Sequence, residues 1–147
     1  MAGKVEAVCI SERKGEPKHQ VDEALLMPDY GIKGDAHAGP GKRQVSLLGV
    51  EDIKAMKEKG FSVGPGDFAE NISISGIDIA RLPVGTRLSI GETELEITQI
   101  GKECHSGCSV FKKTGECIMP RRGVFARVVR GGVVRKGALV SVQTAQR

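Results

Sequence analysis

Hydrophobic and polar positions alternate along several short stretches of the chain, a pattern typical of half-buried β-strands. In the opening stretch, residues 4–11, the side chains of Val5, Ala7 and Cys9 fall on one face. Cys9 is therefore predicted to be a small buried core residue, since free cysteines are often buried. Residues 91–99 alternate in the same way, with leucine and isoleucine facing inward and glutamates facing water. These stretches predict a protein built mainly of strands.

Glycine turns separate the other expected strands, and only one segment has the pattern of a helix. The additional strands are expected at residues 23–27, 43–49, 86–91, 123–132 and 138–143. The helix is predicted over residues 50–60, where acidic residues occupy the first turn, lysines the last, and Gly60 follows as a stop signal. We therefore expect a mostly β barrel with one or two small helices, forming a single domain over residues 1–147.

Composition and charge exclude several classes of function. The chain has 20 glycines, only 3% aromatic residues and a net charge of +4 from 22 basic and 18 acidic residues. Nucleic-acid binding favours basic residues interleaved with stacking aromatics, so no nucleic-acid partner is expected. The mild excess of basic over acidic residues fits a small anionic ligand better. No stretch is apolar and long enough for a signal peptide or a membrane span, so a cytoplasmic protein without a membrane partner is expected.

Three of the four cysteines lie close together, at Cys104, Cys108 and Cys117, with His105 beside the first. A disulfide framework is not expected in the reducing cytoplasm. A structural zinc site usually shows two close cysteine pairs, whereas this stretch has one loose pair and a single cysteine, so the fourth ligand would be His105 or the distant His37. Basic residues near the cysteines favour a reactive thiolate. Reactive or metal-binding cysteines therefore fit this clustering better than simple core filling.

Polar residues in three glycine-rich segments are further candidates. Asp35 and His37 are two positions apart, so extended chain would place them on one face, where they could bind metal, relay a proton or brace a turn. Arg43 precedes an expected strand, and its planar guanidinium suits a phosphate or carboxylate, although solvated arginines are common at strand edges. Asn71 could cap a turn or hydrogen-bond a ligand. Spacing alone does not choose among these roles.

Taken in order, five stretches of the chain resemble the MOSC domain family, named for the C-terminal domain of eukaryotic molybdenum-cofactor sulfurase. The family's fold is a β-barrel, which agrees with the strand pattern, and the compact chain resembles its short single-domain bacterial type. The resemblance extends from about Gly31 to the end of the chain. The matching stretches are GIKGDAHAG, RQVSLL, GDFAENISISGIDIARLPVGTRLSIG, LEITQIGKEC and GECIMPRRGVFARVVRGG.

The resemblance implies binding of molybdenum cofactor, also called molybdopterin, and handling of sulfur or molybdenum in the biosynthesis of molybdoenzyme cofactors. The family cysteine after the LEITQ strand corresponds to Cys104, which is implied to be a persulfide carrier or a molybdenum ligand. The cofactor's terminal phosphate makes three arginines candidate anchors, and three polar residues would line the same mouth. These six cofactor-binding candidates are Arg43, Arg121, Arg122, Asp35, His37 and Asn71.

The resemblance also implies partners, because the pyridoxal-phosphate desulfurase domain of the eukaryotic enzyme is absent. Sulfur would come from a cysteine desulfurase and pass to a molybdoenzyme or a cofactor-biosynthesis protein, in a sulfurtransferase-type activity. The alternative is a non-catalytic module that binds or delivers the cofactor with Cys104 as metal ligand, and a small zinc protein is the third possibility. The sequence leaves open whether Cys108 and Cys117 take part and whether the barrel forms a homodimer.

Overall fold

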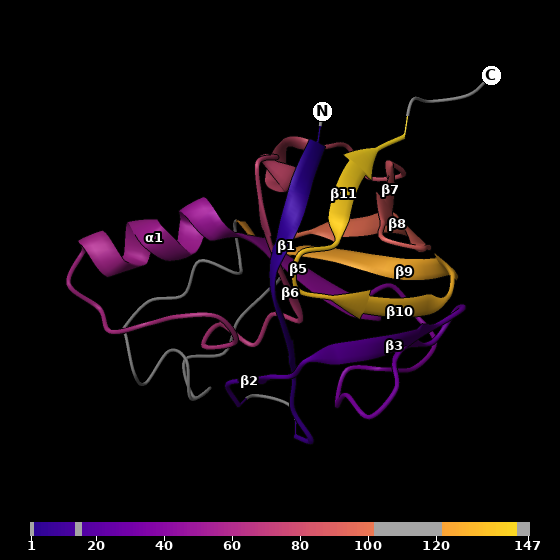
Figure 1. Ribbon diagram of the computed structural model, residues 1–147, viewed down its shortest axis with the longest axis horizontal. Coiled ribbons are helices and arrows are strands. Elements are labelled where there is room, and N and C mark those ends of the chain that lie inside the picture. Colours follow the sequence, from indigo (N-terminus) through magenta and orange to yellow (C-terminus); the bar gives the residue numbers. More distant parts are fainter. Residues whose placement is uncertain (1, 14–15, 102–121, 144–147) are drawn as a thin grey trace.

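The computed structural model describes residues 2–13, 16–101 and 122–143, which form eleven strands, one α-helix and one 3-10 helix (Figure 1). In chain order these elements are β1 (Ala2–Ile10), β2 (His19–Gln20), β3 (Glu23–Met27), β4 (Gly31–Ile32), β5 (Val45–Gly49), α1 (Val50–Glu58), β6 (Ile72–Ser75), η1 (Ile79–Arg81), β7 (Arg87–Ile90), β8 (Thr93–Ile100), β9 (Val124–Arg130), β10 (Gly132–Arg135) and β11 (Leu139–Val142).

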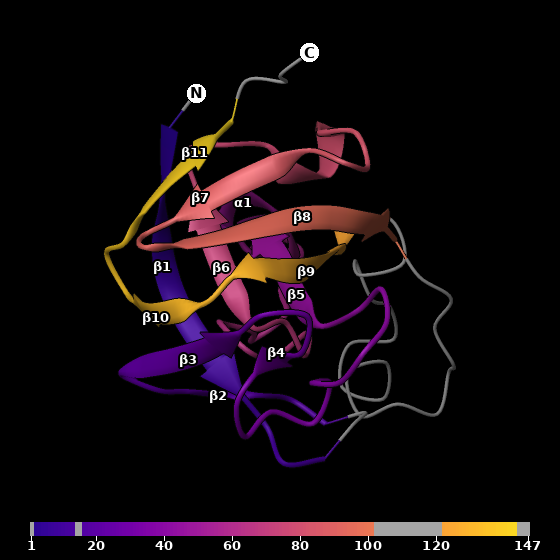
Figure 2. The ribbon, with the colours of Figure 1, turned by 90° about the vertical axis from the view of Figure 1, so that its right-hand side faces the viewer.

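Seven of the strands close into a barrel. The hydrogen-bonded order is β11-β7-β8-β9-β5-β6-β1, and β1 pairs with β11 to complete the ring. All pairs are antiparallel except β5 with β6, which run parallel and are joined through α1. A parallel pair needs such a crossover connection, and α1 is part of the connection here. Both ends of the described chain lie at one end of the barrel, where Ala2 pairs with Ser141 (Figures 1 and 2).

A smaller sheet of three strands, in the order β10-β3-β4, lies beside the barrel (Figure 2). The chain passes from β9 into β10 at Gly131 and Gly132, where it leaves one sheet and joins the other. A Cβ atom on Gly131 would meet the Leu26 carbonyl oxygen at 2.5 Å, so only glycine fits this close approach. These glycines therefore allow the chain to change strand partner between β9 and β10.

Two hydrophobic clusters explain the pattern of buried positions. The larger fills the barrel and includes Val45, Leu47 and Leu95. The smaller lies between the outer face of β5 and α1, where Leu48 packs with Met56. Every residue of β5 is buried because one face contacts the barrel interior and the other faces the helix. A strand covered on both faces loses the simple alternation that marks β1 and β8.

The expectation of a mostly β barrel with a small helical content is confirmed. α1 covers residues 50–58 of the expected 50–60, and β8 has its leucine and isoleucine inward as predicted. Cys9 is fully buried, as expected. The short strands β2, β4 and β6 had no clear signal in the sequence. In the described part of the chain, no helix is both long and apolar enough to cross a membrane.

Candidate functional site

A polar pocket lies where the segment between β4 and β5 passes the end of β8. Its volume is about 590 Å³, and we call it the His37 pocket. Histidine, lysine, arginine and glutamine side chains line it, and none of the lining residues that the structure describes is acidic. A pocket with these donors and positive charges attracts an anionic ligand. Its lining residues are His37, Ala38, Gly39, Pro40, Lys42, Arg43 and Gln99.

Tight turns shape the segment that carries His37. The Asp35 amide donates to the Ile32 carbonyl at 3.1 Å, and the Ala38 amide donates to the Asp35 carbonyl at 3.2 Å. Gly34 has φ of +88°, a left-handed conformation that glycine adopts without strain. Extended chain would place Asp35 and His37 on one face, but the turns direct Asp35 into the interior and His37 to the pocket.

A buried lysine connects Asp35 with His37. The Lys18 ammonium donates to Asp35 Oδ1 at 2.9 Å and to Ser11 Oγ at 3.1 Å, and it lies 2.9 Å from His37 Nδ1. The backbone amide of Ser11 donates to Asp35 Oδ1 and that of His37 to Asp35 Oδ2, each at 3.1 Å. Asp35 therefore holds the lysine and the two backbone segments in one hydrogen-bonded cluster behind the pocket.

The protein environment keeps Asp35 ionised. Burial favours the neutral acid, but the hydrogen bond and charge of Lys18, together with the backbone donors, outweigh it, so the pKa of Asp35 is lowered below its ordinary value. Both side chains of the Lys18–Asp35 pair have no exposed surface. A buried ion pair of this kind depends on such added hydrogen bonds, because two desolvated charges are costly without them.

Sequence reasoning missed Lys18. It lies in a polar stretch that reads as a solvated turn, and lysines are almost never fully buried unless they are paired. Its partner Asp35 is 17 positions away in sequence, so no local pattern signals the pair. The Lys18 amide also donates to the Gly66 carbonyl at 2.7 Å, which anchors this turn to the loop before β6. The burial of Lys18 thus comes from tertiary contacts.

Arg43 lines the His37 pocket. Its guanidinium carbon is 5.7 Å from the centre of the Phe125 ring, a cation–π contact that supports the side chain from one side. Lys42 and Gln99 line the same pocket and were not singled out from the sequence. Gln99 belongs to β8, so two distant parts of the chain contribute to the pocket.

Two predicted site residues, Cys104 and Arg121, lie outside the described residues. The described chain before them ends at Gly101, whose amide donates to the Gly123 carbonyl at 2.7 Å and so joins the ends of β8 and β9. Gln99, which lines the His37 pocket, also donates through Nε2 to the Gly101 carbonyl at 2.8 Å. The barrel therefore ends beside this pocket, three residues before Cys104 in the sequence.

Asn71 is fully buried, and its side chain joins three parts of the chain. Its Oδ1 atom accepts from the Ser46 amide at 2.9 Å and from Ser46 Oγ at 3.1 Å, and its Nδ2 donates to the Cys9 carbonyl at 3.0 Å. These bonds connect the start of β6 to β5 and β1. These contacts make Asn71 a structural brace between strands, a role that differs from the turn cap and the ligand contact that the sequence left open.

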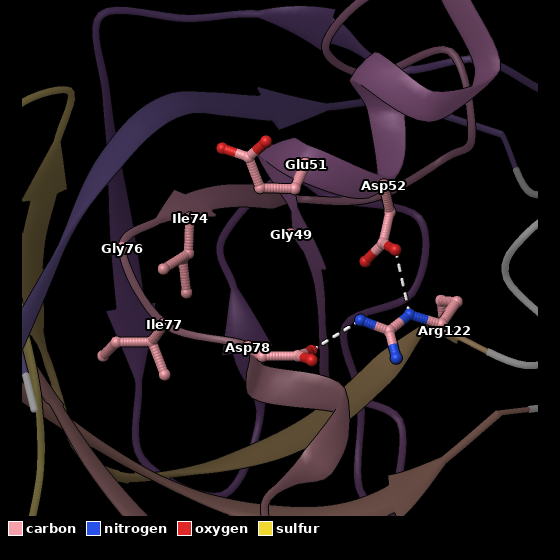
Figure 3. A pocket seen from close by; sticks show the side chains of 8 residues that line it. All are labelled: Gly49, Glu51, Asp52, Ile74, Gly76, Ile77, Asp78 and Arg122. Atoms are coloured by element: carbon pink, nitrogen blue, oxygen red, sulfur yellow. Dashed lines mark hydrogen bonds and ion pairs between the residues drawn. The ribbon is translucent and has the colours of Figure 1, made fainter.

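Arg122 lies in a second pocket, of about 260 Å³, that Figure 3 shows. Its Nε donates to Asp52 Oδ1 at 2.9 Å and its Nη2 to Asp78 Oδ1 at 2.5 Å. The guanidinium thus connects α1, which carries Asp52, with the start of η1. Arg122 does not line the His37 pocket among the described residues, so the structure brings Asp35, His37 and Arg43 together but not Arg122 or Asn71.

A second buried acid, Glu70, lies close enough to Cys9 for its charge to affect the thiol. Glu70 is fully buried and accepts from the amides of Gly66 at 2.6 Å and Phe68 at 3.1 Å. Burial disfavours the charged carboxylate more strongly than these hydrogen bonds favour it, so the pKa of Glu70 is raised to about 7. Burial, with a further effect from Glu70, also raises the pKa of the Cys9 thiol to about 12. Cys9 is therefore an unreactive thiol, since nucleophilic attack requires the thiolate.

Within residues 2–13, 16–101 and 122–143, no three His, Cys, Asp or Glu side chains are placed to hold a metal ion. His37 Nδ1, one candidate for a zinc ligand, faces the Lys18 ammonium instead. The cysteine stretch that motivated the zinc alternative lies outside these ranges, so that alternative remains a prediction.

Comparison with known proteins identifies the family of this chain. The family model of the MOSC domain matches residues 33–141. No curated protein sequence matches the chain.

Solved structures of similar fold include a YuaD protein from Bacillus subtilis, with 21% identity, a TM-score of 0.81 and coverage of 99% of this chain and 98% of that one. YiiM from Escherichia coli has 19% identity and a TM-score of 0.71, covering 99% of this chain and 71% of that chain. YiiM from Geobacillus stearothermophilus has 16% identity and a TM-score of 0.75, covering 97% and 75%. At these identities the likeness establishes the fold.

Proposed function

The chain belongs to the MOSC domain family, and from this premise we propose that it binds molybdenum cofactor in the His37 pocket and handles sulfur or molybdenum through Cys104. The observation that carries the proposal is the lining of that pocket, which combines His37, Lys42 and Arg43 with Gln99 at the end of β8. Cys104 follows Gln99 by five positions, so covalent geometry keeps the two within about 18 Å.

The described residues fit a ligand of this class. The cofactor's pterin ring system offers many hydrogen-bonding groups, and its terminal phosphate is an anion. Arg43, supported by the Phe125 ring, and Lys42 would hold the phosphate, while Gln99 and His37 would hydrogen-bond the polar edge. When bound, the cofactor supplies a molybdenum centre that can accept sulfur. Asp35 keeps its role behind the pocket, where it orients the segment that carries His37.

The sulfur-carrier step at Cys104 is a thiol–persulfide exchange. The Cys104 thiolate attacks the outer sulfur of a cysteine persulfide on a donor cysteine desulfurase. A new S–S bond forms at Cys104, the S–S bond of the donor breaks, and the donor cysteine leaves as a thiolate. One sulfur atom is transferred from the donor cysteine to Cys104, and no external oxidant or reductant is consumed. The partners in this proposal are the desulfurase and an acceptor molybdoenzyme or cofactor-biosynthesis protein.

A second candidate function is a non-catalytic module that binds or delivers the cofactor, with Cys104 as a metal ligand. The observation that favours it is the lining of the His37 pocket, where the described residues offer charged and polar binding groups and no cysteine. These groups can bind an anionic ligand without any group transfer. Both functions use the same pocket and differ in what Cys104 does.

Peptide mass analysis after incubation with a cysteine desulfurase and free cysteine tests the carrier function. The expected result is the gain of one reductant-labile sulfur on the peptide that contains Cys104. The matched controls are the Cys108→Ser and Cys117→Ser variants, which should keep the modification, and Cys104→Ser, which should lose it. If an active donor leaves Cys104 unmodified while Cys104→Ser loses bound molybdenum, the delivery module is the correct function.

A further inference from the structure

The contact between Lys18 and His37 determines which ring nitrogen carries the proton. The Lys18 Nζ atom lies 2.9 Å from His37 Nδ1, 2.9 Å from Asp35 Oδ1 and 3.1 Å from Ser11 Oγ. A lysine ammonium has three donor hydrogens and no acceptor. Asp35 Oδ1, a carboxylate oxygen with no exposed surface, keeps Lys18 charged. His37 Nδ1 must therefore accept a hydrogen bond and carry no proton of its own.

The competing arrangement would place a proton on Nδ1 and direct it to Asp35. His37 Nδ1 lies 3.9 Å from Asp35 Oδ2, which is too long for a hydrogen bond, and Oδ2 already accepts from the His37 amide at 3.1 Å. A proton on Nδ1 would also point at the Lys18 ammonium, so two donors would face each other at 2.9 Å. The geometry therefore favours the neutral ring with its proton on Nε2.

We propose that Lys18 is a positioning residue that holds His37 as the neutral Nε2–H tautomer, so that the ring offers the His37 pocket a hydrogen-bond donor. In this state neither ring nitrogen presents a lone pair for a metal ion, because Nδ1 accepts from Lys18 and Nε2 carries the proton. The ligand group that faces His37 is then an anionic acceptor, such as a phosphate, oxo or thiolate group. That last step rests on the proposed function of the pocket, whereas the tautomer itself does not.

The tautomer is measured by long-range ¹H–¹⁵N correlation spectra of the full-length protein labelled with ¹⁵N, without any ligand. The spectra are recorded about two pH units above the ordinary histidine pKa of about 6.5, where neutral rings dominate. The His37 signals are assigned with a His37→Gln variant, and exposed His19 serves as an internal reference for a solvated ring. The expected spectrum shows one His37 nitrogen fully unprotonated, Nδ1, and the other fully protonated, while His19 shows averaged values.

The variant that tests the cause is Lys18→Met combined with Asp35→Asn, which removes both buried charges and leaves none unpaired. Its His37 ring should move to averaged values like those of His19, while dispersed amide signals report that the barrel is intact. The proposal is overturned if wild-type His37 has a protonated Nδ1 or an averaged pattern. It is also overturned if a folded double variant keeps the wild-type pattern. If the double variant does not fold, Lys18→Arg, which keeps a cationic donor, must retain the wild-type tautomer.

A phosphate titration then separates this inference from the proposed function. With inorganic phosphate as probe, shifts of the His37 Nε2–H signal are expected in wild type, and they should be lost in Arg43→Ala, which keeps the His37 ring but removes the proposed phosphate partner. A correct tautomer without any phosphate or cofactor response would contradict the proposed ligand and leave the role of Lys18 standing. A cofactor response with a protonated Nδ1 would contradict the role of Lys18 alone.

Discussion

The Lys18 ammonium lies 2.9 Å from Asp35 Oδ1, and neither side chain is exposed to solvent. The two residues belong to loops that meet beside the His37 pocket, so this ion pair couples the order of the site to the stability of the barrel. Removing one partner of a buried pair leaves an uncompensated charge, whereas removing both does not.

We therefore predict that Lys18→Met lowers the free energy of unfolding by about 3 kcal/mol or more, because Asp35 loses its buried counter-charge. The double variant with Asp35→Asn should be destabilised by less than the sum of the two single variants, with a coupling of about 2 kcal/mol. Urea unfolding of wild type, Lys18→Met, Asp35→Asn and the double variant gives the four free energies of this double-mutant cycle. Strictly additive effects would contradict the pair as the anchor of the site.

Gly66 and Gly64 form a matched pair for testing the loop before β6. Gly66 has φ of +88°, and a Cβ atom there would overlap the Lys18 carbonyl oxygen, whereas a Cβ on Gly64 meets nothing within 4 Å. Gly66→Ala should therefore cost about 2 kcal/mol in unfolding free energy, and Gly64→Ala should be near neutral. Thermal and urea unfolding check this. Equal effects of the two substitutions would show that the close approach to Lys18 does not constrain the loop.

Glu70 should give stability an unusual dependence on pH. Its pKa is raised to about 7 in the folded protein, from an ordinary value near 4.5, so the folded state binds more protons than the unfolded state between these values. The free energy of unfolding should thus fall as pH rises from about 4.5 to about 7 and then level off. Asp35, whose pKa is lowered, changes its protonation only below this pH range, where its contribution to the free energy of unfolding is lost as pH falls.

The Glu70→Gln variant removes this titration, so its unfolding free energy should vary less between pH 4.5 and 7 than that of wild type. Urea unfolding at several pH values measures both curves. A wild-type curve that rises with pH across the window, or one that Glu70→Gln leaves unchanged, would contradict the raised pKa of Glu70.

Cys9 should be inert in the native protein. The side chain is fully buried and its pKa is raised to about 12, so almost no thiolate is present near neutral pH. Alkylation with iodoacetamide, followed by peptide mass analysis, should label Cys9 only after unfolding in denaturant. Labelling of native Cys9 at the rate seen in denaturant would mean that the Cys9 strand opens readily.

The parts of the fold that could be predicted are those with local patterns. β8 alternates cleanly because one face fills the barrel and the other carries charged side chains such as Glu94 and Glu96, which pair with arginines on neighbouring strands. α1 shows its acidic start and glycine stop. β6 carried no signal, since its four residues follow a loop whose polar Asn71 is buried only through contacts with β5 and β1.

The candidate site was partly predictable for the same reason. Asp35, His37 and Arg43 stand out because glycines and charge mark their segments, and the structure places them at or behind one pocket. Lys18 could not be found, because its burial depends on an acid 17 positions away. Arg122 looked like a phosphate anchor, yet two carboxylates from α1 and the start of η1 hold it. Residue type suggests an anchor, but only tertiary contacts decide its partner.

The most direct test of the account is capture of molybdenum cofactor by the purified protein. Cofactor released from a molybdoenzyme is mixed with wild type, Arg43→Ala or Arg81→Ala, and bound pterin and molybdenum are measured after gel filtration. Arg81 is a matched control, because it is exposed and pairs with Asp78 away from the His37 pocket. The account predicts binding by wild type and Arg81→Ala and a roughly tenfold or greater loss for Arg43→Ala, since hydrogen bonds to charged groups contribute about 1.5–3 kcal/mol. Failure of wild type to retain cofactor, or equal retention by all three proteins, would contradict it.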